Sequence, residues 1–227
     1  TGEASHTFVF KNASTEQKRM RAGGIIGIPL TLLQWGVHQH TGAVVDPLTI
    51  ANNFVVCHAG YDADRFDPVT APDWVRWTTR VAAVASTAFY ASDPHTLVLA
   101  PLVPPLHLYY ARTKPAIAPI KPFAVAALWT TAVYAVPLLR GTDAHGDAAA
   151  ASALWLSLAA LSHAADVMDM VEDEADGLRT PAVQMTDAEA RRYAVALAFA
   201  AAVVDVSAST HPSPLYDAFV GLAAWGV

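Results

Sequence analysis

The stretch DAAAASALWLSLAALSHAADVMDMVEDEADGLRTPAV (residues 147–183) decides the fold class. Its first half contains no charged residue from position 148 to position 165, which is enough for a helix that crosses most of the ~30 Å hydrocarbon core of a bilayer. Its second half holds six of the twenty acidic residues of the chain, between Asp166 and Asp176. We therefore expect an apolar membrane helix that leads into a densely acidic connection.

The composition of the whole chain favours a membrane protein. Of its 227 residues, 54% are hydrophobic and only 15% are charged, whereas about a quarter of the residues are charged in a typical soluble domain. The formal net charge of −6 argues against a strongly basic nucleic-acid binder, so we expect no nucleic-acid partner. The single cysteine, Cys57, excludes an internal disulfide, and we interpret it as a small buried apolar side chain.

Charge-poor segments follow one another along the chain, and we interpret each as a membrane-embedded helix in contact with lipid. The third and fourth are separated only by the turn signal Ser92-Asp93-Pro94. We expect an all-α, multi-pass integral membrane bundle of about eight helices in residues 22–227, with residues 1–21 as an N-terminal tail. The eight segments are residues 22–41, 43–60, 80–92, 95–111, 122–139, 148–165, 191–209 and 212–227.

The basic residues agree with this topology, because Lys and Arg gather on one side of a membrane. With eight helices, the N-terminal tail and the connections after the second, fourth and sixth helices share one side, which we call the basic side. Thirteen of the fourteen Lys and Arg residues fall there, and only Arg140 falls on the other side. The dense acidic groups in residues 62–73 and 166–176 share the basic side.

Asp166, Asp169 and Asp173 have the spacing i, i+3, i+7, which places three carboxylates on one face of a helix. Like charges at these spacings repel each other, so near a lipid boundary the arrangement requires a compensating cation. Mg²⁺ fits this requirement, because it prefers oxygen ligands and is often held by one or two carboxylates together with substrate phosphates. The alternative is a solvated acidic loop, and the spacing alone does not choose between the two.

The order of residues around these acids resembles the second signature of the UbiA superfamily of membrane prenyltransferases. That signature reads N-D-x-x-D-x-x-x-D, followed by three spacer residues, Gly, two further residues and Thr. The departure is Ala165 in place of Asn, and the register otherwise holds through Asp166, Asp169, Asp173, Gly177, Arg179, Thr180 and Val183.

A second stretch, YYARTKPAIAPIKPFAVAALWTTAVYAVPLL (residues 109–139), is similar to the family's loop between its fourth and fifth helices. In that loop, a turn rich in Tyr, Arg and Lys precedes a helix that opens with Lys. Lys114 and Lys121 suit phosphate as point charges, and Arg112 suits it as a fork. The alternative is that these residues only anchor the basic side at the membrane interface.

The first family signature is matched only in part. Tyr61, Asp64 and Arg65 agree with its divergent form, Tyr-x-x-Asp-Arg. The closing carboxylate, Asp67, follows Asp64 by three residues rather than four. Asp62 and Asp67 are the candidate substitutes for the carboxylates that the usual signature places here.

The resemblance implies a helical bundle that binds an isoprenyl diphosphate through Mg²⁺ and transfers the prenyl group to an aromatic or tetrapyrrole acceptor. Metal ions and basic side chains would stabilise the leaving diphosphate, while an apolar cavity would shield the allylic cation from water. The resemblance implies metal binding by Asp166, Asp169 and Asp173, a second metal at Asp64 with Asp67, and neutralisation of the leaving group by Arg65, Lys114 and Lys121. The further candidates for binding the Mg²⁺ cofactor and its diphosphate are Asp62, Asp67, Arg112, Glu172 and Arg179.

A second hypothesis is a non-catalytic subunit that keeps the scaffold, because the first signature is shortened. Such a protein packs Ala-rich helices against other membrane subunits and binds quinone, carotenoid or chlorophyll, for example in a photosystem of a plastid thylakoid membrane. His163 precedes Asp166 by three residues and is a candidate to orient that carboxylate. The histidines in or beside apolar segments are candidate ligands of chlorophyll or haem, or hydrogen-bonding groups inside the bundle: His38, His40, His58, His107 and His163.

Overall fold

The computed structural model describes residues 33, 36–37, 42, 46–65, 71–140 and 147–208. Side chains are described at these positions except 57–58, 61–65, 111 and 206–208. Every regular element in the described ranges is a helix, which confirms the all-α fold class for that part of the chain. The expected first and last helices, residues 22–41 and 212–227, lie outside the described residues apart from Leu33, Gly36 and Val37.

The first half of the described chain forms a helical hairpin and a shorter return segment. Helix α2 spans Pro47–Arg65, α3 spans Asp73–Ala91, and the 3₁₀ turn η1, Leu97–Leu102, leads into α4, Val103–Leu108. The turn signal at residues 92–94 separates α3 from η1, as the sequence predicts. Helix α3 begins at Asp73 rather than at residue 80, because Arg76 pairs with Asp73 one turn away and extends the helix beyond its apolar part.

The middle of the chain forms one long, irregular helical run. It comprises α5 (Tyr110–Ile117), the 3₁₀ turn η2 (Ala118–Ile120), α6 (Lys121–Thr130), the π-helical turn η3 (Thr131–Ala135) and α7 (Val136–Arg140). This run contains the expected helix of residues 122–139. The prolines explain part of the irregularity, because a proline inside a helix removes a backbone donor.

The second half contains the quoted apolar stretch and its acidic connection. Helix α8 spans Ala148–Met168, the short helix α9 spans Met170–Ala175, and α10 spans Asp187–Ala208. Asp147 caps α8, because its side chain accepts a 2.8 Å hydrogen bond from the Ala149 amide. Gly177 follows the C-terminal cap of α9. It has a φ of +71°, a left-handed conformation that glycine adopts at little cost and that commonly terminates a helix.

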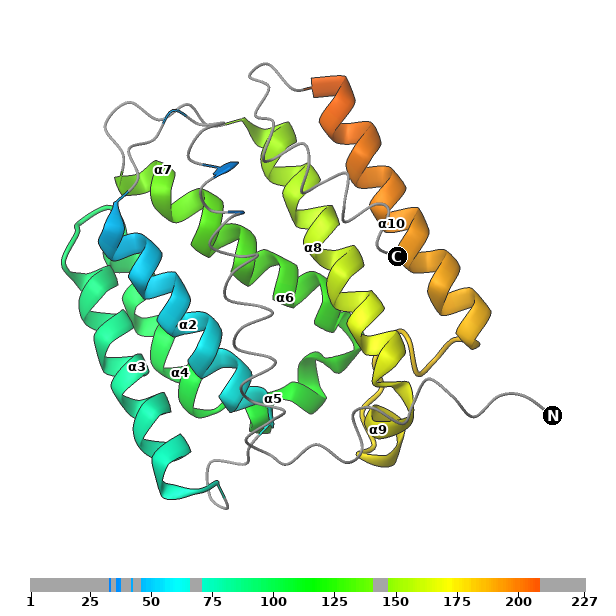
Figure 1. Cartoon of the computed structure of the whole chain (residues 1–227), viewed down its shortest axis with the longest axis horizontal. Coiled ribbons are helices and arrows are strands. Elements are labelled where there is room, and N and C mark those ends of the chain that lie inside the picture. The colour runs from blue at the N-terminus through cyan, green and yellow to red at the C-terminus, as the bar shows by residue number, and fades with distance from the viewer. Residues whose placement is uncertain are drawn as a thin grey trace.

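The helices lie side by side, and their ends define two ends of the bundle (Figure 1). The start of α3, α5, the start of α6, α9 and the start of α10 lie toward the same end of the bundle, in the lower half of Figure 1. We call this the basic end, because these segments and the connection between α9 and α10 carry every basic residue other than Arg140 whose side chain the structure describes: Arg76, Arg80, Arg112, Lys114, Lys121, Arg179, Arg191 and Arg192. Arg140 ends α7 at the opposite end (Figure 1). The grouping that the sequence predicts is therefore present in the described residues.

Small residues make the closest helix packing. Helix α8 packs against both α6 and α10, and alanines fill much of the buried contact, among them Ala126, Ala159, Ala160 and Ala198. Small side chains allow helix backbones to approach closely, which is the usual means of helix association in lipid.

Two helical segments in the described ranges are long and apolar enough to cross a membrane. They are the continuous run Arg112–Arg140, of 29 residues, and α8, of 21 residues. The described part of the chain is therefore an all-helical bundle with two candidate membrane helices. The larger number of about eight membrane helices stays a prediction.

Candidate functional site

Two of the segments singled out in the sequence meet at the basic end. The Lys121 Nζ atom donates a 2.5 Å hydrogen bond to Asp166 Oδ1 and lies 3.9 Å from Asp173 Oδ2. The exposed fractions of the three side chains are 10%, 2% and 6%, respectively. We call these three residues the buried acidic centre. Charged groups this deeply buried are stable only when they are paired, so the lysine offsets much of the cost of burying the carboxylates.

Three different helices position the members of this centre. Lys121 is the first residue of α6, where Pro122 suits the first turn because no intrahelical partner is needed for its missing amide. Asp166 lies in the last turn of α8, and Asp173 lies in α9. Folding therefore brings together side chains that are 45 residues apart in the chain.

The expected single row of three carboxylates does not form. Helix α8 ends at Met168. Asp169 is the junction between α8 and α9, with a φ of −97° and a ψ of 5°. This break changes the helical register, so Asp166 and Asp173 are buried whereas Asp169 is exposed. Two carboxylates, rather than three, enter the buried acidic centre.

The carboxylate pair is the strongest metal candidate in the described part of the chain. No group of three or more His, Cys, Asp or Glu side chains lies close enough to hold a metal ion within the described residues. Mg²⁺, however, is often held by one or two carboxylates with substrate phosphates completing its shell. The Asp166 Oδ2 atom is buried and has no hydrogen-bond partner, so its lone pairs suit such a cation.

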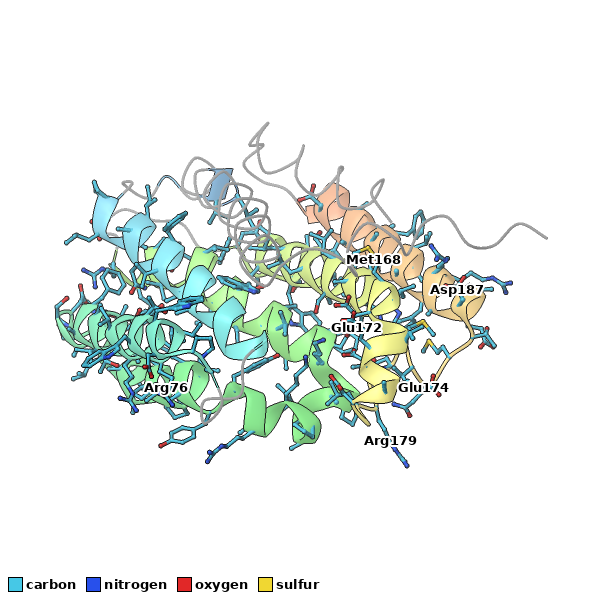
Figure 2. The ribbon with its side chains drawn as sticks, turned by 60° about the horizontal axis from the view of Figure 1, so that its bottom comes forward. Arg76, Met168, Glu172, Glu174, Arg179 and Asp187 are labelled. Atoms are coloured by element: carbon cyan, nitrogen blue, oxygen red, sulfur yellow. The ribbon has the colours of Figure 1, made fainter. Side chains whose placement is uncertain are left out.

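The other predicted residues with described side chains lie outside this centre, at the basic end. Glu172, Arg179 and Arg112 are exposed, and Lys114 is half-buried. Figure 2 shows Glu172, Glu174 and Arg179 around α9 and the connection that follows it. They are therefore surface charges around the centre rather than members of it.

The first family signature lies partly outside the described residues. The backbone at Asp62, Asp64 and Arg65 belongs to the last turns of α2, near α5 at the basic end (Figure 1). Asp67 lies outside the described residues. The second metal site expected at Asp64 and Asp67 accordingly stays a prediction.

The two described histidines of the apolar segments bond to backbone carbonyl groups. The His163 ring is fully buried, its Nε2 atom lies 3.0 Å from the Ala190 carbonyl oxygen on α10, and it packs edge-on against Tyr193. His107 Nδ1 lies 3.1 Å from the Val103 carbonyl oxygen. His163 therefore connects α8 to α10, which agrees with the expectation of a hydrogen-bonding group inside the bundle rather than with the expectation that it orients Asp166.

A buried amide pair on α2 is a feature that the sequence argument missed. Asn53 Nδ2 donates a 3.0 Å hydrogen bond to the Ala132 carbonyl oxygen, inside the π-helical turn. Asn52 lies beside Tyr90 on α3. Both asparagines are at least nine-tenths buried. Two consecutive amides inside the apolar segment 43–60 were the available signal, because a buried amide in a membrane-like core requires a partner.

Comparison with known proteins adds no relative from which a function could be transferred. No protein-family model matches the chain. No curated protein matches it in sequence. No solved structure matches its fold.

Proposed function

We propose that this chain is a UbiA-like integral membrane protein that moves an isoprenyl group from a diphosphate donor to an aromatic or tetrapyrrole acceptor. One observation carries the proposal: Lys121 and the Asp166/Asp173 pair, from the two stretches that resemble the family, share one buried centre at the basic end. A solvated acidic loop would leave these carboxylates exposed, whereas two of them are almost wholly buried. That burial favours a specific polar site over the loop.

Membrane embedding is supported by the outward faces of α3 and α10, which form opposite edges of the bundle (Figure 1). Trp77, Val81 and Val84 on α3 are 65%, 61% and 71% exposed. Val195, Phe199 and Val203 follow a single face of α10 and are 49%, 69% and 50% exposed. Such apolar stripes on both edges are unfavourable in water and favourable in lipid. We propose that these helices face lipid in addition to the two candidate membrane helices.

The proposed reaction separates charge in an apolar interior. The carbon–oxygen bond between the allylic carbon and the diphosphate breaks, and the bonding electrons leave with the diphosphate. The allylic carbon then forms a bond to a nucleophilic atom of the acceptor, and the acceptor releases a proton. A bound Mg²⁺ would supply positive charge to the leaving oxygens. Asp166 and Asp173 are the residues that would hold it, and Lys114 and Arg112 lie at the same end to attract the diphosphate.

Binding of a non-hydrolysable isoprenyl diphosphate to the purified protein tests the proposal. We expect binding that depends on Mg²⁺ and is lost in the Asp166→Asn/Asp173→Asn variant, which keeps the side-chain shapes. The matched control is Asp187→Asn, an exposed carboxylate at the start of α10. Absence of magnesium-dependent binding to the wild type would overturn the enzyme proposal.

A second candidate function is a non-catalytic subunit of a larger membrane complex. It is favoured by the position of Lys121 between the two buried carboxylates. Because Lys121 lies close to both carboxylates, the chain itself supplies one of the two positive charges that the pair requires. Such a subunit would use its exposed apolar faces to bind other membrane subunits, or quinone, carotenoid or chlorophyll, with a thylakoid photosystem as one example. Migration of the mildly solubilised protein in a native gel distinguishes the enzyme from the subunit. The subunit is expected to migrate entirely as part of a larger assembly, whereas the enzyme is not.

A further inference from the structure

We infer that the Lys121 ammonium group is a tethered counter-ion that holds the place of a divalent cation between Asp166 and Asp173. It would have to withdraw before a metal ion binds there. The inference deepens the proposed function, because that function requires a metal at these carboxylates. Its own test needs neither a prenyl diphosphate nor catalytic activity.

The geometry places one cation between two buried anions. Lys121 Nζ lies 2.5 Å from one carboxylate and 3.9 Å from the other. Asp169 adds a further negative charge near Asp166. A metal ion that bridges Asp166 and Asp173 would occupy the same region as the ammonium group. Two cations at that separation repel strongly in a poorly solvated site, so they exclude each other.

The lysine is the member that can move. Its ammonium group stands on a flexible four-carbon stem, and its side chain retains 10% exposure. Asp173, by contrast, is fixed by its backbone on both sides. Its amide donates a 2.8 Å hydrogen bond to the Asp169 carbonyl oxygen, and its carbonyl oxygen accepts a 2.8 Å bond from the Leu178 amide. Displacement of the lysine toward the basic end is therefore the least costly way to open the centre.

The consequence is a site with two alternative occupants. With the lysine in place, the centre is paired and the ends of α6, α8 and α9 are tied together. With a metal ion in place, the lysine amine is released at the basic end, where Lys114 and Arg112 also lie. A released Lys121 would then add to the positive charge that meets an anionic ligand.

The test measures Mn²⁺ binding by the detergent-purified full chain, from the electron paramagnetic resonance signal of the free ion. Mn²⁺ alone is the probe. The variants are Lys121→Gln, Lys121→Arg and Lys121→Gln/Asp166→Asn, and the control is Arg192→Gln, which removes an exposed cation from the same end. We expect Lys121→Gln to bind Mn²⁺ at least about tenfold more tightly than the wild type, because the competing charge is gone. Lys121→Arg and the control should gain nothing, and the double variant should lose the gain.

An unchanged Mn²⁺ affinity in Lys121→Gln would overturn the inference. If Lys121→Gln folds only when Mn²⁺ is present, the metal has replaced the ammonium group and the inference stands. If it fails to fold both with and without Mn²⁺, the metal cannot take that place and the inference is wrong.

The outcomes for the two proposals are separable. Tight Mn²⁺ binding by Lys121→Gln, together with no magnesium-dependent diphosphate binding by the wild type, would retain the tethered counter-ion and reject the prenyltransferase. Unchanged Mn²⁺ affinity in Lys121→Gln, together with magnesium-dependent diphosphate binding by the wild type, would reject the proposed role of Lys121 and retain the prenyltransferase.

Discussion

Lys121 on α6 and Asp166 on α8 form a buried ion pair with 2.5 Å between Nζ and Oδ1. The pair joins the helical run of the middle of the chain to the apolar helix of its second half. Because Lys121 also lies near Asp173, the same side chain reaches α9. Stability and function of the basic end are therefore expected to depend on one lysine.

Removal of Lys121 alone should destabilise the protein more than removal of the whole pair. Lys121→Met leaves Asp166 charged and buried, and breaking one side of a buried pair costs about 3–5 kcal/mol. Lys121→Met/Asp166→Leu also removes the nearer carboxylate, so that only Asp173 is left buried without its cation, and the double variant should be less destabilised than Lys121→Met. Chemical unfolding in detergent measures both free energies. Equal destabilisation by the single and double variants would contradict the ion-pair account.

Asn53→Leu should weaken the contact between α2 and the π-helical turn. The substitution removes the bond to the Ala132 carbonyl oxygen and leaves that oxygen buried without its side-chain donor, which costs about 1–3 kcal/mol. Asn52→Leu is the matched comparison, because it removes a buried amide from the same helix that lies beside Tyr90 rather than beside the π-helical turn. The comparison is made by thermal unfolding in one detergent. A larger loss in Asn52→Leu than in Asn53→Leu would show that the Ala132 bond is unimportant.

The start of α10 should loosen as the pH falls. Thr186 and Glu189 form a capping box: the Thr186 amide and hydroxyl donate to Glu189 Oε2 at 2.9 and 2.7 Å, and the Glu189 amide donates to Thr186 Oγ1 at 3.3 Å. The backbone bond first, and the hydroxyl bond second, hold the pKa of Glu189 below its ordinary value. A lowered folded-state pKa means that the stabilisation is complete above the unfolded-state pKa and disappears as the pH falls through the folded-state pKa.

Hydrogen exchange of the first turn of α10 checks this capping prediction. Protection, corrected for intrinsic exchange rates, should start to fall as the pH drops toward the ordinary glutamate pKa of about 4.3 and should be lost below it, once the pH passes the lowered pKa of Glu189. Glu189→Gln keeps both hydrogen-bonding atoms and removes the titration, so its protection should vary less with pH. The same pH response in Glu189→Gln would assign the effect to another group.

Tyr134→Phe should uncouple the π-helical turn from the start of α8. The Tyr134 hydroxyl donates to the Asp147 carbonyl oxygen and accepts from the Asp147 amide, both at 2.8 Å. Loss of the hydroxyl removes two bonds of about 1 kcal/mol each and exposes Asp147, the cap of α8, to fraying. We expect a lower unfolding temperature and faster exchange at the Ala149 amide. Ser152→Ala, which removes an exposed hydroxyl in the same helix, should change neither.

The helices themselves were largely predictable. The apolar segments 148–165 and 122–139 correspond to α8 and to the run that contains α6, because stretches without charge can be buried only as regular, internally hydrogen-bonded structure. The Ser92-Asp93-Pro94 turn was also predictable, since it combines a capping side chain with a residue that cannot continue a helix. Helix α3 was underestimated, because charge at Asp73 and Arg76 hid a helical turn from a criterion based on hydropathy.

The site was predictable only in part. The spacing of Asp166, Asp169 and Asp173 assumed one uninterrupted helix, and the break at Asp169 turned that residue outward. A junction between two helices depends on how each packs against its neighbours, and residue spacing does not contain that information. The amide of Asn53 was missed for a similar reason, since its partner is a backbone carbonyl 79 residues away.

The amino-acid sequence by itself determined that the described chain is helical, that its charge is concentrated at one end and that acidic and basic side chains occur together there. These properties follow from composition and local spacing, which each residue carries with it. The tertiary structure alone decided which charges meet, because Lys121 becomes the partner of Asp166 and Asp173 only when α6, α8 and α9 converge. Burial makes the identity of these partners important for stability, because a charge that is screened in water requires a specific partner once water is excluded.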